Sequence, residues 1–466
     1  MIQISATKMS HTFISRSTPI NRLPNEVLVE VFKIYAESYP ELLDQTVVDL
    51  PLVSQHWNAV ANATPQLWTK INLSHPFENL QEAKYRVGAS KRENIDISIY
   101  FCDPDWDGEE PDHDVGITET ERGWVKKITE VLNGTEERWR SIVVVSDTWP
   151  PLFGLMEGWT ATNLPSLESI SMERTRPFHG TYNIDFEPRS LIGPMTIFGP
   201  QALLPKLSDL SLSAVHIDWD NTSDWFKNLR KLEIKNQTHD VVPSFEQFAT
   251  MLSDAHRLEC LDVSGFCPDY DTRPINPPLV RLPALKEFTF GWKHPEEGGG
   301  FLDIFQIGSS LETLRLVDTE SDLGYWKDPQ TKYRGWADDS ELIFEVLLGL
   351  GAVAPTDEND PPSKAFISLR GVKKLEIIAT KSGQRRLRTF LGMLTSLEDV
   401  RLEDVDSNVF EAVAQTVVDM AKAGRRLRLN LGWMWRETIP DFAEGVIVDL
   451  DGMPGIEVTT WAGEGQ

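Results

Sequence analysis

The chain has 466 residues, which is too long for one ordinary hydrophobic core unless it is built from repeats that pack on their neighbours. Hydrophobic residues make up 41% of it and charged residues 25%, so the composition excludes a largely disordered chain. Asp and Glu outnumber Lys and Arg by 71 to 45, and the formal net charge is −26. This charge argues against nucleic acid or an anionic membrane as a partner.

The three cysteines, Cys102, Cys260 and Cys267, are odd in number and widely spaced. This usage indicates a reducing compartment and argues against a disulfide scaffold or a four-cysteine zinc site. No apolar run approaches the roughly 18 residues of a membrane span. We therefore expect a cytoplasmic or nuclear protein.

Residues 1–19 are expected to form a disordered tail. A helix is predicted next, because Pro24 suits a first helical turn and the apolar residues after it follow helical spacing. These residues are Val27, Leu28, Val31, Phe32 and Tyr35. A second helix is predicted over about 50–63 with Leu52, Val53, Trp57 and Val60 on one side, and Thr64-Pro65 ends it.

Three short patterns occur in this region: Leu23-Pro24-x-Glu26-Val27-Leu28-x-x-Val31-Phe32, Leu52-Val53-Ser54-x-x-Trp57 and Pro65-x-Leu67-Trp68. Together they resemble the F-box motif, in the form common among F-box-like proteins of mushroom-forming fungi. The pattern departs from the family at Ser54, often Cys, and at His56, often Arg or Lys.

The resemblance implies a three-helix module over 20–74 that docks on the Skp-type adaptor of an SCF ubiquitin ligase and, through it, on cullin. Trp57 and Trp68 would hold the module together. The adaptor-binding residues would be Leu23, Pro24, Glu26, Val27, Leu28 and Val31. The alternative is that two amphipathic helices and a Trp merely cap the repeats that follow.

Residues 75–466, together with the apolar alternation just before them, repeat a loose L-x-x-L-x-x-L-x-L pattern with one strand anchor in each copy. The anchors are Ile71, Ile97, Ile142, Ile170, Leu210, Leu232, Leu261, Phe288, Leu314, Leu375, Val400 and Leu427. Most of the gaps between anchors fall within the roughly 20–29 residues of a leucine-rich repeat. The longer gaps predict insertions near 102–121, 173–203 and 318–365.

The predicted fold is therefore α/β: an F-box-like three-helix module followed by an irregular leucine-rich-repeat horseshoe, a curved parallel sheet with helices outside. An ordinary α/β domain could also carry many leucines, but it does not explain the constant period.

Motifs for chemistry are missing from the sequence: we find no phosphate-binding loop, zinc helix or nucleophile elbow. We therefore expect no enzyme activity, no cofactor and no metal site. The stretch from Asp103 to Asp114 places acids and Gly108 much as a calcium loop does. Asp114 is too short for the usual bidentate Glu and Pro111 interrupts the loop, so we interpret the stretch as a solvated acidic insertion.

One residue in each repeat strand should face the concave side, by strand alternation. These residues are Ser171, Ser211, Glu233, Asp262, Thr289, Arg315, Glu376, Arg401 and Arg428. With Arg426, the arginines predict a basic patch for an acidic or phosphorylated protein segment. Alternatively they pair with Glu376, Glu403 and Asp399.

The chain is rich in Trp, and Trp292 and Trp433 follow repeat strands. They could bind a partner, because Trp is enriched at binding hot spots, or fill the core. Together these patterns predict a substrate-recognition adaptor of a Skp–cullin–F-box ligase that binds an unknown protein. The alternative is a non-catalytic scaffold whose F-box-like end no longer binds the adaptor.

Overall fold

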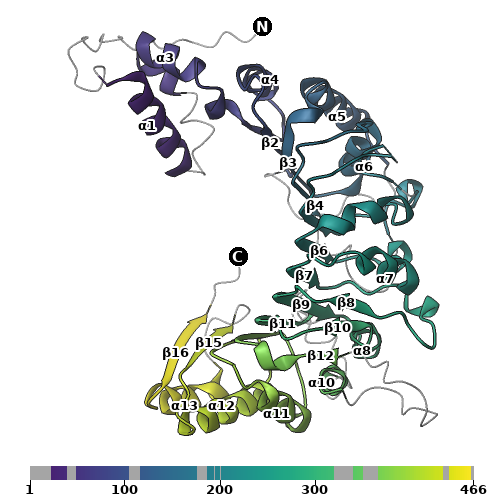
Figure 1. Ribbon diagram of the computed structural model, residues 1–466, viewed down its shortest axis with the longest axis vertical. Coiled ribbons are helices and arrows are strands. Elements are labelled where there is room, and N and C mark those ends of the chain that lie inside the picture. Colours follow the sequence, from purple (N-terminus) through teal and green to yellow (C-terminus); the bar gives the residue numbers. More distant parts are fainter. Residues whose placement is uncertain are drawn as a thin grey trace.

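The computed structural model describes residues 23–38, 49–103, 116–175, 186–193, 195–199, 201–319, 340–349, 366–433 and 440–462. The expected tail over 1–19 lies outside these ranges, as do residues 104–115 of the calcium-like stretch and large parts of the other two predicted insertions. Figure 1 shows an arc, with the N-terminal helices at one end and a curved sheet that leads to the other.

Within these ranges the arc is built on one open sheet of thirteen strands, in which all neighbouring strands are parallel. Except for three strands that form a second sheet, the spatial order follows the chain order. The strands are β1 (Lys70–Ser74), β2 (Ile95–Phe101), β3 (Trp139–Ser146), β4 (Ser169–Arg174), β5 (Asp209–Ser213), β6 (Lys231–Lys235), β7 (Cys260–Val263), β9 (Glu287–Trp292), β11 (Thr313–Asp318), β13 (Lys374–Ile378), β14 (Asp399–Glu403), β15 (Leu427–Trp433) and β16 (Ile456–Ala462).

The predicted strand anchors lie side by side in this sheet. From Ile71 to Val400 each anchor is the direct partner of the next, and all are buried. The exception is Leu427, because the ladder continues through Leu429 and then Val458. The curved parallel sheet is therefore confirmed, with an anchor two residues off in β15 and one further strand, β16.

Helices cover the outer side of the arc (Figure 1). They are α4 (Leu80–Ala89), α5 (Glu119–Leu132), α6 (Trp149–Gly158), α7 (Phe245–Ser253), α8 (Pro295–Leu302), α10 (Ser340–Leu347), α11 (Gln384–Met393), α12 (Ser407–Lys422) and α13 (Asp441–Asp451). Their inward faces are apolar, and several begin at a side-chain cap. In α7, for example, Ser244 and Gln247 form a reciprocal capping box.

The outer layer is less regular than the sequence predicts. Between β5 and β6 a 3₁₀ helix, Asp220–Asn228, takes the place of an α-helix. A second parallel sheet is formed by β8 (Val280–Leu282), β10 (Phe305–Ile307) and β12 (Phe366–Ile367). Prolines flank β8 on both sides, so this stretch is too short for a helix. In the described part of the chain, no helix is long and apolar enough to cross a bilayer.

Candidate functional site

The N-terminal module has a small hydrophobic core of its own. It comprises α1 (Asn25–Ser38), the helical residues 49–53, α3 (Gln55–Asn62) and the 3₁₀ helix η3 (Pro65–Trp68). The buried residues of its core are Leu28, Phe32, Leu50, Val60, Ala61, Leu67 and Trp68. The indole Nε1 of Trp68 donates to the Ala61 carbonyl at 2.9 Å, and this bond fixes η3 against α3.

The predicted second helix is divided at Ser54. Ser54 has an extended backbone and its hydroxyl accepts a hydrogen bond from the Trp57 N–H at 3.1 Å, so α3 begins at a new N-cap. With the break at Ser54, Trp57 and Val60 pack in the module core, whereas Leu52 and Val53 stay exposed. Their exposed fractions are 74% and 43%.

An apolar set of side chains remains exposed on the module. On α1 it follows positions i, i+4 and i+7, the spacing of one helical face. We call the docking set the residues Val27, Val31, Ile34, Tyr35, Leu52 and Val53, each at least 39% exposed. Several exposed apolar side chains on a small module that already has a closed core are typical of an interaction surface.

The residues that the sequence predicts to bind the adaptor differ in exposure. Val27 and Val31 are exposed, as are Pro24 and Glu26, and Leu23 is half-buried. Leu28 is fully buried in the module core, so its assignment to a contact surface is wrong. Adjacent residues of a helix point in different directions. The apolar stripe therefore extends from the side that faces the module core, where Leu28 lies, to the exposed side, where Val27 lies.

Four members of the docking set were not assigned to it from sequence. Ile34 was missed, although its spacing of seven from Val27 is a helical signal. Tyr35 was placed in the apolar stripe without a contact role. Leu52 and Val53 could not be separated from Trp57 without knowledge of the break at Ser54.

Side-chain contacts join the module to the repeat array. The Tyr85 hydroxyl of α4 donates to the Asn62 side-chain oxygen at 2.6 Å. The Tyr85 ring also meets Trp68 edge-on, with ring centroids 5.3 Å apart. Gln66 donates to Glu93 at 2.8 Å. These contacts fix the direction in which the docking set faces relative to the sheet.

The concave side of the sheet carries a continuous row of side chains. Successive members of the row are direct strand partners. The row is Asn72, Ser98, Val143, Ser171, Ser211, Glu233, Asp262, Thr289, Arg315, Glu376, Arg401, Asn430 and Thr459. Its first five members are uncharged, and all of its charged members lie from Glu233 onward.

The middle of the row is an ion-pair network. Glu233 forms ion pairs with Lys231 at 2.7 Å and with Lys235 at 3.4 Å. Lys235 also forms an ion pair with Asp262 at 3.0 Å. Burial alone would raise the pKa of Glu233, but hydrogen bonds from Lys231 and Ser211 outweigh it and lower the pKa. The charged side chains in this part of the concave face therefore largely neutralise one another.

Each predicted concave arginine has an acidic neighbour. Arg401 pairs with Glu403 at 2.6 Å, Arg315 with Glu376 at 3.6 Å, and Arg428 with Asp399 at 3.2 Å. These are the acids that the sequence offered as the alternative to a basic patch. The partner of Arg401 across the strands is Asn430, so Arg428 lies two residues before the position that was predicted for it.

The remaining members of the predicted patch differ in exposure. Arg426 is exposed immediately before β15. Trp292 and Trp433 are each only 2% exposed, so they fill the core and cannot contact a partner directly. Trp149 and Trp219 are buried in the same way. Of the two interpretations of Trp292 and Trp433, the core interpretation is the correct one.

All three cysteines carry free thiols. Burial raises the pKa of Cys102 and Cys260 to about 11 and that of Cys267 well above its ordinary value. The thiolate is the reactive form, so these residues behave as packed thiols.

Residues 20–74 match the family model described as F-box-like. No curated protein is matched by the chain. A solved structure titled "Crystal structure of Rad7 and Elc1 complex in yeast" is 8% identical, with a TM-score of 0.32, over 94% of this chain and 97% of that one. The N-terminal module is thus F-box-like, and the fold of the array is established by its own strand pairing.

Proposed function

We propose that the chain is a substrate-recognition adaptor of a Skp–cullin–F-box ubiquitin ligase. The F-box-like module would bind a Skp-type adaptor through the docking set, and the concave face of the array would hold a protein substrate. The observation that carries the proposal is the docking set itself. The module closes its own core around Leu28, Phe32 and Trp68, yet leaves six apolar side chains exposed.

The adaptor contact is tested by calorimetric titration of the full chain with a recombinant Skp-type adaptor. Val27→Asp with Val31→Asp places two charges in an apolar interface and should weaken binding by about 100-fold or more, because a buried unpaired charge is costly. Leu23→Ala with Pro24→Ala should also weaken binding, with thermal unfolding nearly unchanged.

The matched control is Val448→Asp, because Val448 is 73% exposed on α13 at the far end of the array. It should bind the adaptor as the unchanged chain does. If the unchanged chain fails to bind any Skp-type adaptor tested, the chain is a repeat scaffold instead. If binding survives both double substitutions, the docking set is not the contact.

A further inference from the structure

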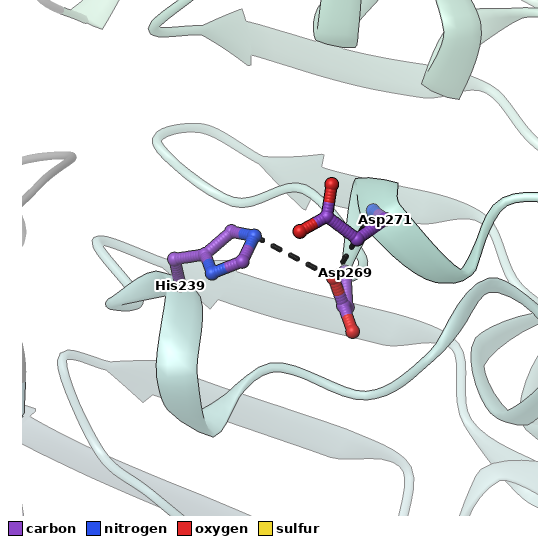
Figure 2. A group of neighbouring side chains, drawn as sticks. All are labelled: His239, Asp269 and Asp271. Atoms are coloured by element: carbon purple, nitrogen blue, oxygen red, sulfur yellow. Dashed lines mark hydrogen bonds and ion pairs between the residues drawn. The ribbon is translucent and has the colours of Figure 1, made fainter.

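Three potential metal ligands from two different loops meet at the carboxyl-terminal edge of the sheet. His239 begins a short 3₁₀ helix (His239–Val241) after β6. Asp269 and Asp271 follow β7, at the start of another (Tyr270–Thr272). One ligand atom from each residue lies within 4.8 Å of the others. Figure 2 shows the imidazole of His239 directed toward the two carboxylates.

The distance between His239 and Asp269 suits a shared ion better than a direct hydrogen bond. The Nε2 atom of His239 lies 3.5 Å from Oδ1 of Asp269. A good hydrogen bond would bring them to about 2.9 Å. Two ligands bound tetrahedrally to one ion at about 2.1 Å are about 3.4 Å apart, which agrees with the observed spacing.

The two loops are held in place independently of any ion. The Asp269 N–H donates to the Pro243 carbonyl at 2.9 Å, which joins the loop after β7 to the loop after β6. The Asp271 N–H donates to Oδ1 of Asp269 at 3.2 Å. Beside His239, Asp240 is fixed by the Phe186 N–H and by Arg189. The ligands would therefore need little reorganisation to bind.

Within the described ranges, no lysine or arginine balances the carboxylates of this cluster. Neither Asp269 nor Asp271 forms an ion pair with either residue type in those ranges, and His239 balances Asp269 only when protonated. Two neighbouring carboxylates in a chain of net charge −26 repel each other. A bound cation would relieve that repulsion.

We propose that His239, Asp269 and Asp271 bind one divalent transition-metal ion, with Zn²⁺ as the ion that fits best. An imidazole nitrogen selects Zn²⁺ over Mg²⁺ or Ca²⁺, and three protein ligands with a solvent-facing side leave a coordination position open. The ion would link two successive repeats. Because it binds ligands that only the folded chain brings together, it would stabilise the array.

The test is calorimetric titration of the full chain, first stripped with a chelator, with Zn²⁺ alone. We expect one site per chain, weakened by about 100-fold in His239→Gln and by at least about tenfold in Asp271→Asn. Zn²⁺ should also raise the thermal unfolding temperature of the unchanged chain, and this rise should disappear in both variants. Far-ultraviolet circular dichroism establishes that the variants fold.

The matched control replaces His256 by Gln and Asp254 by Asn, since both are exposed and lie at the opposite end of β7. It should retain the site. The proposal is overturned if no saturable binding occurs, if His239→Gln binds as tightly as the unchanged chain, if the control abolishes binding, or if Ca²⁺ or Mg²⁺ binds more tightly than Zn²⁺.

Discussion

Lys293, directly after β9, is a lysine that the repeat pattern gives no reason to expect in a buried position. Its ammonium donates to the Gln237 carbonyl at 3.0 Å, across two repeats. Burial lowers its pKa from 10.5 to about 8, although Cys267 and Glu297 act in the opposite direction. Because Lys293 is harder to protonate in the folded chain than in the unfolded chain, the free energy of unfolding depends on pH.

The sign of that dependence follows from proton linkage. Between pH 8 and 10.5 the unfolded chain keeps a proton on Lys293 that the folded chain has released. The free energy of unfolding should therefore rise with pH across this window, by at most about 3 kcal/mol from this residue. Chemical denaturation of the unchanged chain and of Lys293→Met at several pH values measures it. A difference between the two proteins that stays constant with pH would contradict the assignment.

At the scale of single residues, sequence predicts burial less well than it predicts secondary structure. Val27 and Leu28 are adjacent and chemically alike, yet one is 45% exposed and the other is fully buried. Helical periodicity places both near the boundary of the apolar face, and only the position of α3 decides between them. Trp292 and Trp433 show the same ambiguity, because a Trp after a strand can turn inward or outward.

At the scale of elements, the register between neighbouring strands can be predicted from sequence where the leucine pattern allows only one set of residues to face the core. Leu210, Leu232 and Leu261 are strand partners, as their shared spacing predicts. In β15 three alternating leucines, Leu427, Leu429 and Leu431, satisfy the pattern equally well. The pairing with β14 selects Leu429 over Leu427. That choice depends on a neighbouring strand and not on local sequence.

The concave arginines of β14 and β15 provide a prediction at this scale. An acidic or phosphorylated partner would have to compete with Glu403 and Asp399 for Arg401 and Arg428. If it does so, Arg401→Gln with Arg428→Gln should reduce capture of acidic proteins by the full chain about tenfold. It should also make capture less dependent on salt.

Affinity capture at low and high salt, followed by quantification of the retained proteins, measures both effects. Lys227→Gln with Lys286→Gln is the control, because these exposed lysines are also ion-paired but lie outside the strands, in an earlier part of the array. Equal capture and equal salt dependence in the arginine variant would show that the two arginines pair with their acidic neighbours and do not bind the partner protein.

At the scale of the whole molecule, the direction of the module relative to the array depends on few contacts. A rigid joint would hold a bound adaptor and a bound substrate at a constant separation. Tyr85 is central to this joint, because its ring meets Trp68 and its hydroxyl meets Asn62. It is also 51% exposed, so the core does not depend on it.

Replacing Tyr85 by Ala should therefore loosen the joint without unfolding either part. Loss of the ring contact and the hydrogen bond should weaken it by about 1–3 kcal/mol. Amides of α3 and η3 should then exchange with deuterium about tenfold faster or more, while those of β6 and β7 should not change. Tyr85→Phe keeps the ring contact and should show a smaller effect. Adaptor affinity should stay the same in both variants, because Tyr85 is not part of the docking set. If exchange in α3 and η3 is unaltered in Tyr85→Ala, the remaining contacts, such as the bond from Gln66 to Glu93, are sufficient to fix the module.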